Sequence, residues 1–92
     1  MIINWKNRKL QKFFEKGERK GIDAKHADKL LYLLSILNAA KSPLALDLHG
    51  YDFHELKGNK KGLYAIRISG NYRLVFGFKG DKAIDIDLID YH

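Results

Sequence analysis

The stretch from Lys57 to Arg73 holds five cationic side chains and no acidic one. Its cations are Lys57, Lys60, Lys61, Arg67 and Arg73. Lysine and arginine offer fixed positive charge, and arginine can hold a phosphate or a carboxylate through two parallel hydrogen bonds. One interpretation is therefore a site for an anionic partner. The alternative is a solvated basic loop, which the charge alone supports equally well.

Two helices are predicted in the first half of the chain. Asn7 is a suitable N-cap for a helix that runs to Lys16, and Gly17 can end it in the left-handed conformation. Asp23 is a suitable N-cap for a second helix, which Pro43 closes off. Apolar side chains recur at helical spacing in both segments: Leu10, Phe13 and Phe14 in the first, and Ala27, Leu30, Leu31, Leu34 and Leu37 in the second.

The apolar period changes from 3.6 to 2 at about residue 53, which predicts an antiparallel meander of strands. Turns are predicted at residues 57–62, 70–71 and 80–81, and residues 1–5 are compatible with a further short strand. The apolar sets of the last three strands are Tyr64, Ile66 and Ile68; Tyr72, Leu74, Phe76 and Phe78; and Ile84, Ile86 and Leu88. We therefore predict an α+β fold, with two N-terminal helices packed on one face of a small, mainly antiparallel twisted sheet.

The register of two strands brings two arginines together. A two-residue turn after Ser69 would put the apolar sets of the flanking strands on opposite faces of the sheet. A three-residue loop pairs Ile68 with Tyr72 and keeps both sets on one face, so the core pattern favours it. In that register Arg67 lies directly opposite Arg73 on the polar face.

Like charges directly opposite one another destabilise a sheet, so a negative group is expected near these two arginines. One candidate is Asp85 or Asp87 from the last strand, which shares that face if the strands are neighbours. The other candidate is a bound phosphate held by the guanidinium groups. The lysines of the adjoining loop favour the phosphate.

The composition excludes several classes of protein. The chain has 92 residues and a formal net charge of +6, and this length suits a single domain, residues 1–92. The absence of cysteine excludes a disulfide scaffold, a thiolate zinc site and a cysteine nucleophile. No secretory signal is visible, and the longest apolar run is far shorter than the roughly 20 residues that cross a bilayer. A cytoplasmic location without a membrane partner is therefore expected.

Four short motifs, in order along the chain, carry a family resemblance. They are residues 54–58 (HELKG), 62–68 (GLYAIRI), 70–74 (GNYRL) and 90–92 (DYH). Together with the opening, residues 2–17 with the pair Phe13-Phe14, they resemble the HigB-like branch of the RelE toxin superfamily over essentially the whole chain.

The resemblance implies a metal-free, ribosome-dependent endonuclease that cleaves mRNA in the decoding site. It implies attack of the ribose 2′-hydroxyl on the adjacent phosphorus, which leaves a 2′,3′-cyclic phosphate and a 5′-hydroxyl end. It also implies neutralisation by an antitoxin of helix-turn-helix fold, a free toxin that is a monomer, and no cofactor.

The resemblance also implies roles for individual residues. It aligns His54, Asp90, Tyr91 and His92 with the catalytic cluster of the family, and Lys57 and Arg73 with its phosphate-contacting cations. Arg67 is a further helper, and Lys60 and Lys61 are candidates for RNA binding. Histidine suits acid–base work because its ordinary pKa lies near neutral pH. The preferred assignment makes His54 or His92 the base, and the other histidine or Asp90 the acid.

Without the resemblance, these residues have ordinary explanations. His54 reads as a strand histidine, His92 as a terminal residue, and His26 and His49 receive no functional role. His49 and His54 make a poor metal site because no further ligands cluster with them. Two other functions fit the same residues. One is a non-catalytic basic module that binds an RNA or DNA backbone. The other is a degenerate toxin that binds its antitoxin and no longer cuts.

Overall fold

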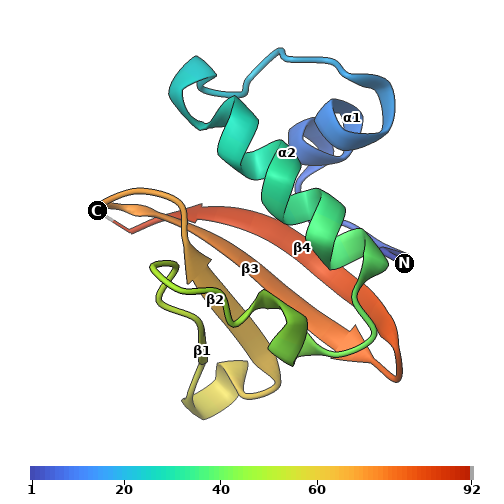
Figure 1. The fold of residues 1–92 in the computed structure, drawn as a ribbon, viewed down its shortest axis with the longest axis vertical. Helices are drawn as coiled ribbons and strands as arrows, with labels where there is room; N and C mark the ends of the chain where they lie inside the picture. The colour runs from blue at the N-terminus through green and yellow to red at the C-terminus, as the bar shows by residue number, and fades with distance from the viewer. Residues whose placement is uncertain (92) are drawn as a thin grey trace.

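Two helices lie on one face of a four-stranded antiparallel sheet in the computed structural model, which describes residues 1–91 (Figure 1). The strand order β1-β2-β3-β4 makes each strand pair with its neighbour in sequence. The elements are α1 (Arg8–Lys16), α2 (Ala24–Ala39), η1 (Pro43–Leu46), β1 (His54–Glu55), η2 (Gly58–Lys60), β2 (Leu63–Arg67), β3 (Tyr72–Lys79) and β4 (Lys82–Asp90). The predicted α+β fold is confirmed.

The helices begin and end where their capping residues predict. The side chain of Asn7 accepts a hydrogen bond from the backbone N–H of Leu10 at 3.0 Å. Gly17 ends α1 with a φ of 70°, a conformation that costs glycine no steric strain. At the start of α2, the carboxylate of Asp23 accepts from the N–H of Lys25 at 2.9 Å. These contacts satisfy backbone donors that have no partner inside the helix.

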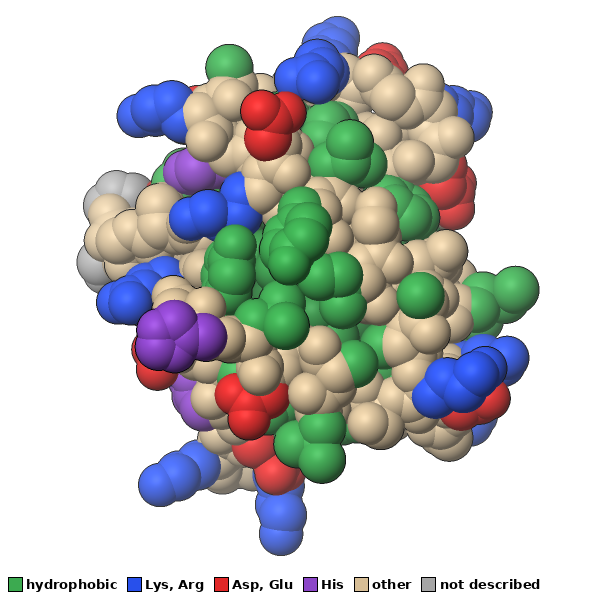
Figure 2. All heavy atoms as spheres, in the orientation of Figure 1, with side chains coloured by type: hydrophobic (Ala, Val, Ile, Leu, Met, Phe, Trp, Pro, Cys, Tyr) green, Lys and Arg blue, Asp and Glu red, His purple; other side chains and the backbone are tan. Residues whose placement is uncertain are grey.

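The core lies between the helices and the sheet. Most of its large, fully buried members come from α1, α2 and the three long strands: Leu10, Leu30, Leu33, Leu34, Leu37, Ile66, Leu74, Phe76 and Ile86. Leu46 of η1 and Ile68 of the β2–β3 loop also belong to this buried set. Each such side chain contributes roughly 1.5–3 kcal/mol when it leaves water. Figure 2 shows hydrophobic side chains gathered in the middle of one face, with Lys and Arg around its rim. Within residues 1–91, no helix is long and apolar enough to cross a membrane.

The predicted register between β2 and β3 is confirmed. Ile66 pairs with Leu74, and Arg67 pairs with Arg73. The N–H of Ile68 donates to the carbonyl of Tyr72 at 2.9 Å, which closes the three-residue loop. The two arginines therefore lie opposite one another, on the face that points away from the helices.

A bulge in β4 corrects one part of the predicted pattern. Val75 pairs with Asp87 but Gly77 pairs with Ile84, so the register shifts between them. Asp85 in this region has a φ of 55°. The irregularity changes the phase of the strand, as bulges do. Ala83, rather than the predicted Ile84, is therefore fully buried in the core beside Ile86.

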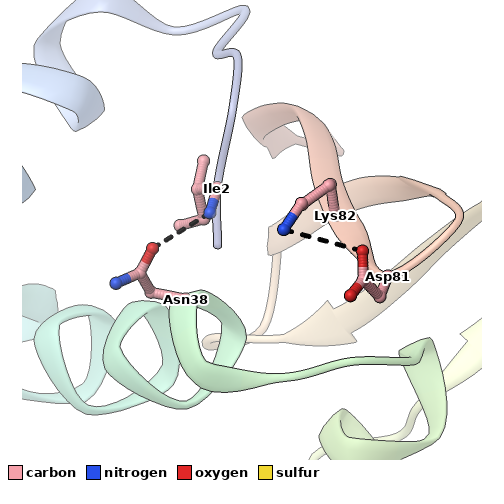
Figure 3. Close-up of polar contacts among 4 residues, drawn as sticks. All are labelled: Ile2, Asn38, Asp81 and Lys82. Atoms are coloured by element: carbon pink, nitrogen blue, oxygen red, sulfur yellow. Dashed lines mark hydrogen bonds and ion pairs between the residues drawn. The ribbon is translucent and has the colours of Figure 1, made fainter.

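The first five residues run along β4 as isolated parallel bridges rather than as a named strand. Ile2 pairs with Ala83, and Trp5 pairs with Ile86. The N–H of Ile2 also donates to the side-chain oxygen of Asn38 in α2 at 2.9 Å (Figure 3). This segment covers the edge of β4, which would otherwise expose unpaired backbone groups.

Candidate functional site

The face of the sheet that points away from the helices carries several of the predicted site residues; we call it the outer face. Side chains alternate along a strand, so the neighbours of the buried Ile66 and Leu74 point outward. Arg67 and Arg73 occupy this face as a pair. His54 shares it, because His54 pairs with Ala65, the residue before Ile66. The sheet therefore brings one histidine and two arginines onto one surface.

Arg73 is held in place by the loop that precedes it. Its Nη1 donates to the carbonyl of Ser69 at 3.0 Å, of Gly70 at 3.0 Å and of Tyr72 at 3.2 Å. Its guanidinium carbon lies 5.9 Å from the centre of the Tyr91 ring. Within residues 1–91, Nε and Nη2 make no recorded hydrogen bond, so these donors can address an anion.

The two arginines are not neutralised by the carboxylates predicted as one alternative. Among the described residues, the recorded ion pair joins Lys82 to Asp81 at 3.7 Å (Figure 3). The carboxylate of Asp87 instead accepts from the N–H of Leu88 at 2.8 Å. No ion pair joins Arg67 or Arg73 to Asp85 or Asp87 within residues 1–91, although Asp87 pairs with Val75 and therefore shares the outer face, as that alternative required. The like charges stay together on the outer face, which favours an external anion.

The ring of His54 is oriented by the backbone. Its Nδ1 lies 2.9 Å from the carbonyl oxygen of Asp52, and a carbonyl can only accept, so Nδ1 carries the proton. The neutral ring then has its lone pair on Nε2. The residue is exposed, and Nε2 is available to take a proton from a bound molecule.

The three lysines of the β1–β2 loop, Lys57, Lys60 and Lys61, form what we call the loop cluster. Lys57 and Lys61 line one open hollow of about 340 Å³, together with Glu55. Lys60 lines a second hollow, about 100 Å³ in volume, together with Tyr91. The loop cluster therefore places positive charge along two hollows, one of which reaches Tyr91.

The second hollow is lined by apolar side chains together with two lysines and two aspartates. Its lining residues are Lys6, Leu56, Lys60, Leu63, Val75, Asp85, Asp87, Ile89 and Tyr91. Sequence reasoning assigned no role to Leu56, Leu63, Val75 or Ile89. One feature of the sequence could have indicated this hollow. Val75 and Ile89 are apolar, although the alternation places both on the polar face of the sheet. Apolar side chains beside an aromatic ring and cations suit the flat surface of a nucleobase, and Asp85 and Asp87 could accept from its amino groups.

The carboxyl end of β4 lies beside the β2–β3 turn (Figure 1). Asp90 pairs with Tyr72, and the N–H of Tyr91 donates to the carbonyl of Asn71 at 2.8 Å. The Tyr91 side chain is 43% exposed and close to Arg73. The structure therefore brings together Tyr91, Arg73 and Arg67, with Asp90 at the same edge. His92, the remaining predicted residue, lies outside the described residues.

The chain matches the model of one protein family. Residues 3–92 match the family described as the RelE-like toxin of the type II toxin-antitoxin system HigB. The match therefore covers almost the whole chain, as the resemblance in the motifs predicted.

Individual proteins show the same similarity. The chain is 32% identical over 92 residues to a protein of Proteus vulgaris named Endoribonuclease HigB, and the alignment covers all of both chains. It is 33% identical over 87 residues to a Vibrio cholerae protein named Toxin HigB-1, with 92% of each chain covered. Among solved structures, a copper-bound mutant toxin from Helicobacter pylori superposes with a TM-score of 0.57 and 23% identity, covering 98% of this chain and 93% of that chain. This last likeness concerns the fold.

Proposed function

The chain belongs to the HigB-like family of RelE-like toxins of type II toxin–antitoxin systems, and on that premise we propose that it is an endoribonuclease that cleaves mRNA on the ribosome. The observation that carries the proposal is the pair Arg67 and Arg73 on the outer face, without carboxylate partners among the described residues. The relative named as an endoribonuclease, aligned over the whole chain, supports the same activity.

The proposed reaction uses the RNA's own 2′-hydroxyl as the nucleophile. A base removes the proton of the 2′-hydroxyl, the 2′-oxygen bonds to the adjacent phosphorus, and the bond from phosphorus to the 5′-oxygen breaks. An acid then donates a proton to the leaving 5′-oxygen. The products are a 2′,3′-cyclic phosphate and a 5′-hydroxyl end, and the reaction requires acid, base and fixed cations from the protein.

The outer face offers the base and the cations, and Asp90, a candidate acid, lies at the adjoining end of β4, paired with the core-facing Tyr72. We assign the base to His54, because its Nδ1 faces the carbonyl of Asp52 and its Nε2 is left with a lone pair. The acid is Asp90 or His92. Arg73, with Lys57, stabilises the charge that develops on the phosphate, and Arg67 assists. Tyr91 stacks on a base of the message.

The partners follow from the same family. We propose that an antitoxin of helix-turn-helix fold neutralises the protein, and that the free toxin is a monomer. The RNA substrate is mRNA in the ribosomal decoding site, which places the active toxin in the cytoplasm. Lys60 and Lys61 of the loop cluster contact the RNA backbone, an interaction that weakens as salt rises.

Expression without the antitoxin tests the proposal directly. We expect growth arrest, and we expect mapped mRNA 5′ ends to fall within translated codons. In a purified system, ribosome-bound message should be cut far faster than the same RNA without ribosomes. Equal cleavage of naked RNA would contradict the ribosome-dependent mechanism.

The same basic face also fits a non-catalytic binding module or a degenerate toxin. Either alternative predicts that the protein binds RNA or antitoxin and leaves mRNA intact. The mapped 5′ ends separate these readings from the proposed nuclease, because only cleavage creates new ends within codons.

A further inference from the structure

The turn between β2 and β3 holds two residues of the proposed site. Its carbonyls at Ser69 and Gly70 accept from Nη1 of Arg73 at 3.0 Å each, and its carbonyl at Asn71 accepts from the N–H of Tyr91 at 2.8 Å. A shift of this turn therefore moves the guanidinium of Arg73 and the backbone of Tyr91 together.

Residues in the first turns of α2 contact the same loop from the core side. Nε2 of His26 lies 3.0 Å from the hydroxyl oxygen of Ser69, and the His26 ring meets the ring of Tyr72 edge-on at 4.9 Å. One turn along the helix, Nζ of Lys29 donates to the carbonyl of Ile68 at 2.7 Å. Contacts from α2 and from the proposed site thus fall on opposite sides of one short loop.

His26 is the buried polar side chain of the described core, with 8% of its surface exposed. A buried polar group is costly unless it is hydrogen-bonded, and Ser69 supplies the bond that satisfies its Nε2. The proposed reaction gives His26 no chemical step. His26 is nevertheless buried, and it is hydrogen-bonded to the β2–β3 turn that holds Arg73. These features indicate a different role.

We propose that His26 and Ser69 are positioning residues, whose hydrogen bond fixes the β2–β3 turn so that the guanidinium of Arg73 meets the scissile phosphate. This inference rests on the proposed RNA cleavage. The contacts run in one chain, from His26 to the hydroxyl of Ser69 and from the carbonyl of Ser69 to Arg73. A misplacement of about 1 Å in a catalytic group can cost roughly 100-fold in rate. The charge on the phosphate grows in the transition state, so the loss falls on kcat.

Removal of either partner tests the pair. For cleavage of ribosome-bound message, we expect Ser69→Ala and His26→Leu each to lower kcat about 10-fold with KM nearly unchanged. His26→Gln should recover most of the rate, because its side-chain amide can reach the hydroxyl of Ser69. The matched control is Ser35→Ala, since the Ser35 hydroxyl bonds within α2 to the carbonyl of Leu31; its kcat should stay parental.

A second arm separates positioning from a general loss of stability. In an Arg73→Ala background, Ser69→Ala should cause no further loss, because the group that it positions is gone. If Ser69→Ala lowers the rate equally in both backgrounds, the positioning role is overturned.

A third arm needs no cleavage at all. Amide and guanidinium NMR of the full chain should show slowly rotating Nη groups of Arg73 in the parent and in Ser35→Ala, and fast rotation in Ser69→Ala. If the parent protein cuts no RNA but Ser69→Ala still speeds the rotation of the Arg73 Nη groups, the proposed function is contradicted. The hydrogen-bonded pair would then still be shown to hold Arg73 in place. An unchanged Arg73 signal in Ser69→Ala overturns the inference, whatever the activity.

Discussion

Arg73 combines a fixed position with two further groups, Nε and Nη2, that form no hydrogen bond within residues 1–91. Three carbonyls hold its Nη1, while its guanidinium carbon lies 5.9 Å from the Tyr91 ring. A lysine at this position would keep the charge, but it has neither the planar fork nor the geometry to bond three carbonyls and a phosphate at once. The role of this residue therefore depends on shape as well as on charge.

We predict that Arg73→Ala lowers kcat for ribosome-bound message by roughly 100- to 1,000-fold, the loss typical for one donor to a developing oxyanion. Arg73→Lys should recover only part of it, because a single ammonium cannot make the same set of bonds. Cleavage rates measured with message in excess check both variants. Lys79→Ala, at the far end of β3, is the control, and parental cleavage by Arg73→Ala would contradict the assignment.

His54 is the proposed base of the reaction, and its replacement should abolish most of the activity. His54→Gln removes the imidazole whose Nε2 is proposed to take the proton of the 2′-hydroxyl, so kcat should fall by about 10²–10⁴-fold. The residue is exposed, so the thermal melting temperature of the His54→Gln variant should stay close to that of the parent protein. His49→Gln, an exposed histidine outside the strands, should cleave normally. A His54→Gln variant with parental kcat would remove His54 from the role of base.

At the scale of the elements, capping residues determine where the helices start. The side chain of Asn7 accepts from Leu10 and opens α1, which supplies Leu10 and Phe13 to the core. We predict that Asn7→Ala lowers the free energy of unfolding by about 1 kcal/mol, measured by urea denaturation. Asn59→Ala, an exposed position in η2, should change it by less than about 0.5 kcal/mol. Equal losses in the two variants would show that the Asn7 bond adds nothing.

The sequence was sufficient to predict the helices, the meander and the pairing of Arg67 with Arg73. This pairing was predictable because a slip of one residue would turn every apolar side chain of a strand to the wrong face. The bulge in β4 was not predictable in this way. It depends on Asp85 adopting a φ of 55°, whereas alternation alone assigns Ile84 to the core face with Ile86 and Leu88, and Ala83 to the other face.

The candidate site was predictable only in part. The sequence indicates which residue types gather near the outer face, and the structure places His54, Arg67, Arg73 and Tyr91 there. The hollow beside Tyr91 could not be predicted, because its apolar side chains come from four separate segments and look like ordinary strand positions. The hydrogen bond of His26 to Ser69 joins residues 43 positions apart, a separation that no local pattern reveals.

For the whole molecule, the distribution of charge matters more than the total of +6. The loop cluster lies along hollows that border the outer face. A second group of cations, Arg8, Lys9, Lys12 and Lys20, lines a separate hollow of about 330 Å³ on α1 and the segment that follows it, together with Glu18. The two groups carry similar charge, but they lie on different parts of the fold.

Salt dependence of RNA binding separates these two groups. Each contact to a phosphate of single-stranded RNA contributes about −0.7 to the slope of log K against log salt concentration. Replacing all three lysines of the loop cluster by alanine should therefore make the slope shallower by about 2, measured by fluorescence anisotropy with a short RNA. The triple replacement of Lys9, Lys12 and Lys20 removes the same charge and should change the slope much less, because only the loop cluster adjoins the proposed phosphate site. Equal changes of the slope in both variants would mean that RNA binding depends on net charge alone. That result would contradict the outer face as the binding surface.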